Sequence, residues 1–171
     1  IVAFFFTAGK KFYGYIGLGD LFVVLFFGLL PVPGVFFLNA GFLTACVFLP
    51  ALSIGFFSTG VLNLNNTRDI ENDRNSGKIT IPVRIGAQNA RFYHLSLILG
   101  GWIVALIFTL NHFYSLWQFI YWITFPFFML DLHQIFRIRN EKELDPFLKR
   151  LALSTLTFTL LFCIGLIFSG K

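Results

Sequence analysis

Charged residues and cysteines are both scarce in this sequence. Only 12% of the 171 residues are charged, whereas a soluble globular domain carries about 25%, so the composition excludes an ordinary soluble domain. The two cysteines, Cys46 and Cys163, lie in apolar runs and match no zinc-binding spacing. We therefore expect neither a disulfide nor a cysteine metal site. The first residues lack the basic segment and cleavage site of a signal peptide, and we interpret them as the end of an earlier membrane helix.

Apolar residues make up most of the chain. Hydrophobic residues account for 57% of the sequence, and 25 residues are Phe. A membrane-spanning helix needs about 20 mostly apolar residues, and five stretches meet that requirement. We therefore predict an all-α, multi-pass transmembrane helical bundle, formed by a single membrane domain over residues 1–171. The expected helices are 21–38, 42–62, 92–110, 116–136 and 147–168.

The connectors between these helices alternate in charge. Segments 7–20, 65–91 and 137–150 contain or adjoin all the Lys and Arg residues except Lys171, whereas the other two connectors are short and uncharged. Successive helices alternate sides of the membrane, so the three charged connectors share one face. The positive-inside rule makes that face cytoplasmic. We expect a protein of the cell membrane, with the lipid bilayer as a partner and without a nucleic acid partner.

A polar segment follows the second predicted helix and carries the strongest candidate site. Asn65, Asp69 and Asp73 are four residues apart, and on a helix this spacing places them on one face. Mg²⁺ binds oxygen ligands, commonly one or two carboxylates together with substrate phosphates. Lys78 and Arg84 follow as cations for phosphate oxygens. The pattern predicts a site for Mg²⁺ and a phosphorylated substrate.

A solvated loop that only sets membrane topology is the simplest alternative for residues 65–91. Three features argue against it. The acids share one helical face, Gly77 precedes Lys78 in a segment where backbone N–H groups can approach an anion, and the connector holds both oxygen ligands and cations.

The residues from Asn65 to Arg74 and from Gly77 to Gly86 resemble the second aspartate-rich motif of the intramembrane aromatic prenyltransferases, the UbiA superfamily. They are most similar to the branch that prenylates 1,4-dihydroxy-2-naphthoate in menaquinone biosynthesis. That branch reads N-N-x-R-D-x-x-x-D-x-x-x-G-K-x-T-L-A-V-R-L-G. In this chain Ile81-Pro82 replaces Leu-Ala and Ile85 replaces Leu, so every polar position is kept.

A second segment, residues 6–20, resembles the Y-T-G-G-P-x-P-Y-G-Y-x-G-L-G-E stretch of the same family. The departures are Phe6 for Tyr, Ala8 for Gly, Lys10 and Phe12 for Pro, and Asp20 for Glu. The resemblance implies a nine-helix protein of which this chain supplies the end of the fourth helix and helices five to nine. The first aspartate-rich motif of the family is absent from these residues, so we expect the 171 residues alone to be inactive.

The resemblance also implies an enzyme and assigns roles to its residues. Mg²⁺ would be bound by Asp69 and Asp73 with help from Asn65, and the diphosphate by Lys78, Arg84 and Arg68. Among these, Asp69, Asp73, Lys78 and Arg84 form the catalytic set. The reaction implied is Mg²⁺-dependent transfer from a polyprenyl diphosphate to dihydroxynaphthoate, with loss of carbon dioxide, which gives demethylmenaquinone.

Other polar residues are weaker candidates. Lys11 and Tyr15 are expected to contact the substrate if their loop closes over the aromatic ring. Asp131 and His133, near the end of the fourth predicted helix, are expected to form a structural pair because intramembrane ionisable groups usually have a partner.

Three alternatives remain open at the level of sequence. The acceptor could be 4-hydroxybenzoate or a tocopherol or chlorophyll precursor instead of dihydroxynaphthoate. A transporter or channel subunit would place ionisable residues at mid-membrane depth, but the five predicted helix centres contain no Asp, Glu, Lys or Arg. A non-catalytic membrane module would not need aligned carboxylates, so replacing Asp69 and Asp73 by Asn would leave its function intact.

Overall fold

The computed structural model describes residues 17–170, which form helices and no strand. Five helical segments are long and apolar enough to cross a membrane. This confirms the prediction of an all-α, five-helix membrane bundle. The segments are Gly19–Ala40, Ala45–Arg68, Ala87–Asn111, Leu116–Arg137 and Glu141–Phe168.

The first span is built from three helical pieces, α2 (Gly19–Val23), the π-helix η2 (Val24–Leu29) and α3 (Pro31–Ala40). The wider π turn is closed by the Leu30 N–H, which donates to the Leu25 carbonyl oxygen at 2.8 Å. Pro31 has no N–H to donate, so α3 begins there.

A close approach of two backbones holds the first span against the second. A Cβ atom on Gly28 of η2 would lie 2.3 Å from the carbonyl oxygen of Ala51, and it would also meet the backbone of Gly55. Glycine is therefore required at position 28. Small residues at such crossings are the usual means by which membrane helices pack closely.

The central helix is α4 (Phe48–Arg68), preceded by the short 3₁₀ helix η3 (Ala45–Val47). It contacts η2, α7 and α9, and it extends to Arg68 rather than ending at residue 62 as predicted. The extension is stabilised by buried polar residues, because the Asn63 side-chain amide donates to the Ala90 carbonyl oxygen at 3.0 Å and the Thr67 hydroxyl donates to the Asn63 carbonyl oxygen at 2.7 Å.

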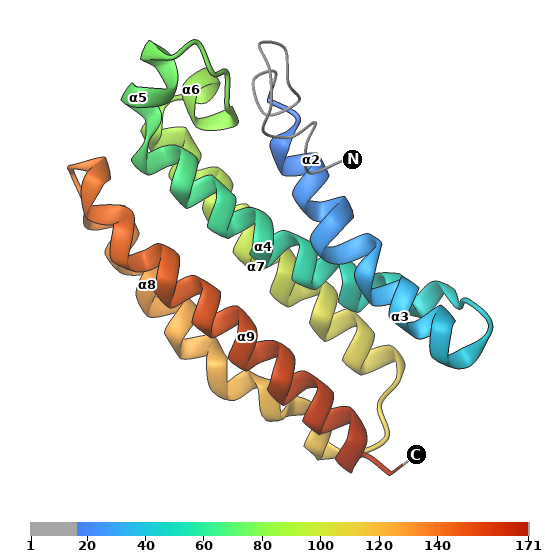
Figure 1. Cartoon of the computed structure of the whole chain (residues 1–171). Coiled ribbons are helices and arrows are strands. Elements are labelled where there is room, and N and C mark those ends of the chain that lie inside the picture. Colours follow the sequence, from blue (N-terminus) through green and yellow to red (C-terminus); the bar gives the residue numbers. More distant parts are fainter. Residues whose placement is uncertain (1–16, 171) are drawn as a thin grey trace.

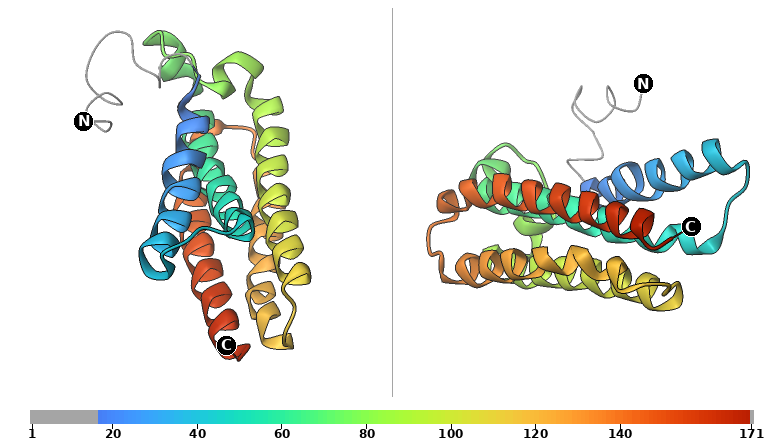
Figure 2. Two further views of the ribbon diagram at one scale, coloured as in Figure 1. Left: turned by 90° about the vertical axis from the view of Figure 1, so that its right-hand side faces the viewer. Right: turned by 90° about the horizontal axis from the view of Figure 1, so that it is seen from below.

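The remaining spans are α7 (Ala87–Asn111), the 3₁₀ helix η4 (Leu116–Thr124) continued by α8 (Phe125–Arg137), and η5 (Glu141–Leu144) continued by α9 (Asp145–Phe168). Figure 2 shows two layers, with α4, α9 and the α2–α3 span in one and α7 and α8 in the other.

Aromatic side chains form the core between these layers. Phe57 of α4 lies with its ring centroid 4.9 Å from that of Phe128 and 5.0 Å from that of Phe158, and Trp102 lies 5.2 Å from Phe158. The Tyr121 hydroxyl lies 3.1 Å from the Thr109 hydroxyl, which satisfies both groups away from water. Part of the large Phe content thus builds a packed core, in addition to the lipid-facing surface.

Near the cytoplasmic end predicted for the bundle, α8 and α9 are joined by an ion pair. Asp131 of α8 pairs with Arg150 of α9. The predicted pair of Asp131 with His133 is therefore wrong. Residues 131 and 133 differ by two positions, so they point to different faces of one helix, whereas Arg150 lies on the neighbouring helix.

The charged connectors that the structure describes gather at one end of the bundle. Figure 1 shows α5 (Ile70–Asn75), α6 (Ile81–Ile85) and the α8–α9 connection at the same end. Arg91 at the start of α7 and Glu141 of η5 lie 3.5 Å apart, which joins the two connectors directly. The alternation of charged and uncharged connectors in the sequence thus corresponds, over the described residues, to a charged and an uncharged end of the bundle.

Candidate active site

The candidate site lies at the junction between α4 and α5, on the polar end of the bundle. Asp69 forms the junction, with φ −97° and ψ 14°. The i to i−4 pattern nevertheless continues across it, because the Asp69 N–H donates to the Asn65 carbonyl oxygen at 3.1 Å and the Asp73 N–H donates to the Asp69 carbonyl oxygen at 2.8 Å. The backbones of Asn65, Asp69 and Asp73 therefore keep the helical spacing expected from the sequence.

Arg68 organises the first half of the site. Its guanidinium donates to Asp69 twice, from Nε to Oδ1 at 2.9 Å and from Nη2 to Oδ2 at 2.7 Å. The Nη2 atom also donates to Asn65 Oδ1 at 2.9 Å, and Nη1 pairs with Asp145 at the start of α9. One cation thus joins the junction to a helix that lies 77 residues further along the chain.

This bidentate contact sets the charge of Asp69. The Arg68 hydrogen bond lowers the pKa of the Asp69 carboxyl, and the charges of Arg68 and Lys78 act in the same direction. Because its pKa is lowered, the Asp69 carboxyl is anionic at neutral pH. Its side chain is 35% exposed and remains accessible from the cavity beside it.

The second half of the site contains Asp73, Lys78 and Asn66. Lys78 Nζ lies 3.0 Å from Asp73 Oδ2 and 3.3 Å from Asn66 Oδ1. The Asp73 side chain is only 7% exposed, so this carboxylate is held by a neighbouring cation inside the fold.

The turn after α5 brings Lys78 back over Asp73. Gly77 has a φ of +74°, a conformation that residues with a Cβ rarely adopt, and a Cβ placed there would meet nothing within 4 Å. The glycine is thus required for its backbone angle and not for space. The turn closes with the Lys78 N–H donating to the Asp73 carbonyl oxygen at 2.9 Å.

Arg84 lies on α6, against the start of the first span. A Cβ on Gly17 would lie 3.2 Å from Arg84 Cζ, so the guanidinium packs over the Gly17 backbone. Thr80 caps α6 by accepting a hydrogen bond from the Val83 N–H at 3.4 Å. Of the other predicted substrate-binding residues, Lys11 and Tyr15 lie outside the described residues.

The donor atoms fit a hard divalent cation. Asp69 and Asp73 supply two carboxylates, and Asn65 and Asn66 supply amide oxygens; Mg²⁺ commonly takes one or two carboxylates and completes its shell with water and substrate phosphates. Over residues 17–170 no group of three or more His, Cys, Asp and Glu side chains is placed to hold a metal ion. Asp69 pairs with Arg68, and Asp73 pairs with Lys78. The predicted stripe of acidic residues thus forms two separate carboxylate–cation pairs.

Two cavities adjoin the site. One of about 550 Å³ lies on the polar side, between the α4–α5 junction and the α8–α9 connection, and is lined by Arg68, Asp69 and Asp145 among others. The other, of about 590 Å³, lies on the membrane side and has Asn65 at its polar end. Asn65 and Asp69, both bound to Arg68, thus stand between a polar space and an apolar one.

Sequence reasoning did not identify Asn66 and Asp145 as part of the site. Asn66 lies within the motif and directly follows Asn65, so its position in the sequence could have indicated a place in the site. In the sequence, Asp145 belongs to what we expect to be an ordinary charged turn before the last helix. Its contact with Arg68 depends on the packing of α9 against α4, which has no local signature.

Comparison with known proteins identifies the family of the chain. The profile of the UbiA prenyltransferase family matches residues 1–156, and the chain belongs to that family. A 1,4-dihydroxy-2-naphthoate octaprenyltransferase of Escherichia coli K12 is 39% identical over 169 residues, which cover 99% of this chain and 55% of the relative. The corresponding protein of Haemophilus influenzae is 37% identical over 98% of this chain and 54% of its own length.

More distant relatives are also similar. A 1,4-dihydroxy-2-naphthoate octaprenyltransferase of Mycobacterium tuberculosis is 30% identical over 92% of this chain and 53% of its own length. A Drosophila melanogaster UbiA prenyltransferase domain-containing protein 1 homolog is 29% identical over 95% of this chain and 44% of its own length. The chain spans about half the length of the curated relatives it matches, and no solved structure matches it.

Proposed function

We propose that this chain forms part of a membrane prenyltransferase that transfers a polyprenyl chain from a polyprenyl diphosphate to 1,4-dihydroxy-2-naphthoate in a Mg²⁺-dependent reaction, giving demethylmenaquinol, the reduced form of demethylmenaquinone. The observation that carries the proposal is the pair of carboxylate–cation contacts at the end of α4, Asp69 with Arg68 and Asp73 with Lys78. Arg68 and Asp69 line a polar cavity, and Asn65, which is hydrogen-bonded to Arg68, lines a mostly apolar one. The family membership of the chain and the named activity of its bacterial relatives support it.

The two pairs suggest how the substrate is bound. Bound Mg²⁺ would supply positive charge that stabilises the departing diphosphate. Asp69 and Asp73 would hold the ion, and Arg68 and Lys78, which pair with these carboxylates in the structure, would bind the diphosphate oxygens. Each side-chain cation would then have a substrate oxygen in place of a protein carboxylate, so that little charge would be left unpaired.

The chemical step follows from this arrangement. The bond between C1 of the prenyl chain and the diphosphate oxygen breaks, and its electron pair leaves with diphosphate. Arg68 and Lys78 stabilise the charge that develops on the leaving oxygens. The ring carbon of dihydroxynaphthoate that bears the carboxylate forms the new bond to C1, and that carboxylate leaves as carbon dioxide, so that its bonding electron pair restores the aromatic ring. The cell membrane is the proposed location, with the site on the cytoplasmic side.

The test uses the intact protein in membranes supplied with octaprenyl diphosphate, dihydroxynaphthoate and Mg²⁺. We expect Asp73→Asn to lower product formation by about a hundredfold or more, since charge stabilisation of this kind contributes several kcal/mol. The matched control is Glu143→Gln, which removes an exposed carboxylate on the same end of the bundle and is expected to stay within about twofold of the unmodified protein.

Full activity of Asp69→Asn combined with Asp73→Asn would refute the site assignment. If product formed only with 4-hydroxybenzoate or another aromatic acceptor, the site assignment would stand and the proposed acceptor would be wrong.

A further inference from the structure

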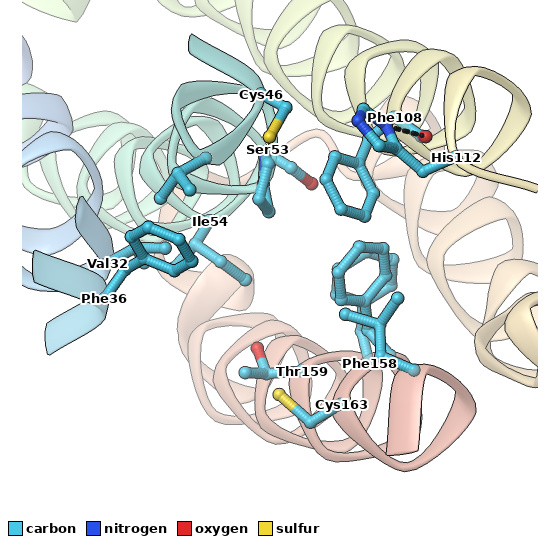
Figure 3. A pocket seen from close by; sticks show the side chains of 14 residues that line it. Val32, Phe36, Cys46, Ser53, Ile54, Phe108, His112, Phe158, Thr159 and Cys163 are labelled. Atoms are coloured by element: carbon cyan, nitrogen blue, oxygen red, sulfur yellow. Dashed lines mark hydrogen bonds between the residues drawn. The ribbon is translucent and has the colours of Figure 1, made fainter. Parts of the chain in front are cut away.

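The outer side of α9 is apolar and exposed. Leu153, Leu156 and Leu160 are 52%, 55% and 55% exposed, and their spacing of three and four residues places them on one side of the helix. The opposite side packs inward, since Phe158 is 1% exposed and points into a cavity between the helices (Figure 3). On a helix long enough to cross a membrane, an exposed apolar side of this kind faces lipid chains.

Lys149 ends this lipid-facing side at the charged end of the bundle. It lies four residues before Leu153 and is exposed, so it continues the same side of the helix. Phe168, the last residue of α9, lies 19 positions after Lys149, or about 28 Å away at the rise of an α-helix. Since the hydrocarbon core of a bilayer is about 30 Å thick, Lys149 lies at the depth of the lipid headgroups when the apolar part of α9 spans the core.

The neighbouring helix α8 has the same arrangement in the opposite direction. Phe127 and Leu130 are 58% and 54% exposed, and Arg137 follows seven residues after Leu130, on the same side, in the last turn of the helix. On this side, Gln134 accepts a hydrogen bond from Arg150 Nη1 at 3.0 Å. Because this contact aligns Gln134 with the residue after Lys149, Arg137 and Lys149 lie within about one helical turn of the same depth.

Neither Arg137 nor Lys149 forms an ion pair within residues 17–170. The carboxylates around them are bound to other arginines, Glu141 to Arg91, Asp145 to Arg68 and Asp131 to Arg150. The remaining one, Glu143, is exposed and pairs with neither cation. The outer side of α8 and α9 therefore presents two exposed positive charges directly beside an apolar surface.

We propose that Arg137 and Lys149 form a binding site for an anionic phospholipid, whose phosphate lies between the two side chains and whose acyl chains cover Leu130 and Leu153. Charge complementarity selects the headgroup, because a zwitterionic phospholipid brings a positive charge of its own to the two cations. The apolar sides of α8 and α9 select a lipid over a soluble phosphate. The inference goes beyond the proposed function and does not depend on it.

The test compares two phospholipids with identical acyl chains, phosphatidylglycerol and phosphatidylcholine. The intact protein in detergent is titrated with each, and the bound lipids are counted by native mass spectrometry. We expect the unmodified protein to prefer phosphatidylglycerol by about tenfold, the order of magnitude that two basic residues at a membrane surface contribute. Combining Arg137→Gln with Lys149→Gln should reduce this preference to about twofold or less.

The matched control combines Arg74→Gln with Lys142→Gln. It removes the same charge from exposed positions at the same end of the bundle, and neither residue continues an exposed apolar side of a membrane-spanning helix. We expect the control to keep the preference for phosphatidylglycerol within about twofold of the unmodified protein. An equal loss of preference in the two double variants would show a general attraction to the charged end and would overturn the proposal.

A second variant separates loss of charge from loss of folding. Arg137→Lys combined with Lys149→Arg keeps both positive charges and should keep the preference for phosphatidylglycerol within about threefold. If this variant loses the preference as completely as the Gln variant, the two charges do not bind the headgroup and the proposal fails.

Inorganic phosphate tests whether the lipid chains matter. Added in excess over the lipid, it should leave phosphatidylglycerol bound, because the apolar sides of α8 and α9 contribute to binding the lipid alone. Displacement by inorganic phosphate would identify a site for a soluble anion and overturn the proposal. Equal binding of the two phospholipids by the unmodified protein would overturn it as well.

Discussion

Arg68 and Lys78 each neutralise one carboxylate of the candidate site. The residue types were predictable because their order and spacing are local properties of the sequence. The partners were not, since Arg68 also binds Asp145 from a helix 77 residues away and Lys78 reaches Asn66 only because the turn at Gly77 folds back. Whether Arg84 joins the diphosphate site stays a prediction; its guanidinium lies over Gly17.

The acid dependence of stability tests the pair of Asp69 with Arg68. Arg68 lowers the pKa of Asp69 in the folded protein, so the pair stabilises the fold above the ordinary carboxyl pKa of about 4 and this contribution is lost as pH falls through the lower folded pKa. We expect Arg68→Gln to lower the melting temperature in detergent most at neutral pH, with the difference shrinking below about pH 4.

The control is Arg74→Gln, which removes an equal charge from an exposed position of α5. The difference in melting temperature between Arg74→Gln and the unmodified protein should not change with pH in that range. A difference for Arg68→Gln that is the same from neutral pH to about pH 3 would show that the ion pair does not stabilise the fold.

At the scale of elements, α4 determines where the site lies. It packs against η2, α7 and α9 at once, and its last turn carries Asn65 and Arg68 beyond the apolar run. The sequence predicted an earlier end for this helix because a hydropathy pattern counts every polar residue as unfavourable for burial. Asn63 is nevertheless buried, because its side chain donates a hydrogen bond to the Ala90 carbonyl oxygen of another helix. The π turn of η2 was likewise not predicted.

The close contact of η2 with α4 makes Gly28 a test of this packing. Gly28→Ala would place a methyl group against the Ala51 carbonyl oxygen, which forces the two helices apart. We expect a loss of about 1–3 kcal/mol, measured as a lower melting temperature of the purified protein in detergent.

The matched control for this substitution lies on α3. A Cβ on Gly34 meets nothing within 4 Å, so Gly34→Ala should be neutral or slightly stabilising because alanine is the better helix former. Equal melting temperatures for the two variants would mean that the backbones are not in contact at Gly28.

At the scale of the whole molecule, residues 17–170 form a bundle with one charged end and one uncharged end. The charged end holds α5, α6, η5 and the candidate site (Figure 1). The cytoplasmic position of that end stays a prediction, based on the distribution of Lys and Arg.

Thiol labelling of intact cells tests this orientation. Asn39→Cys lies at an exposed position near the end of α3, and Lys142→Cys at an exposed position of η5. We expect a membrane-impermeant maleimide added outside to label Asn39→Cys and to leave Lys142→Cys unlabelled until the cells are opened, with the unmodified protein as background. The opposite pattern would place the site on the outer face.

Local patterns in the sequence were enough to predict the class of fold and the chemical character of the candidate site. Apolar runs of membrane length, the alternation of charged connectors and the order of Asn65, Asp69 and Asp73 are local features, and hydropathy and helical spacing translate them directly into helices and faces. Which cation holds which carboxylate, how far α4 extends and where the cavities lie became known from the tertiary structure. These depend on contacts between helices far apart in the chain, which are set by side-chain shape and close packing and leave no local pattern to read.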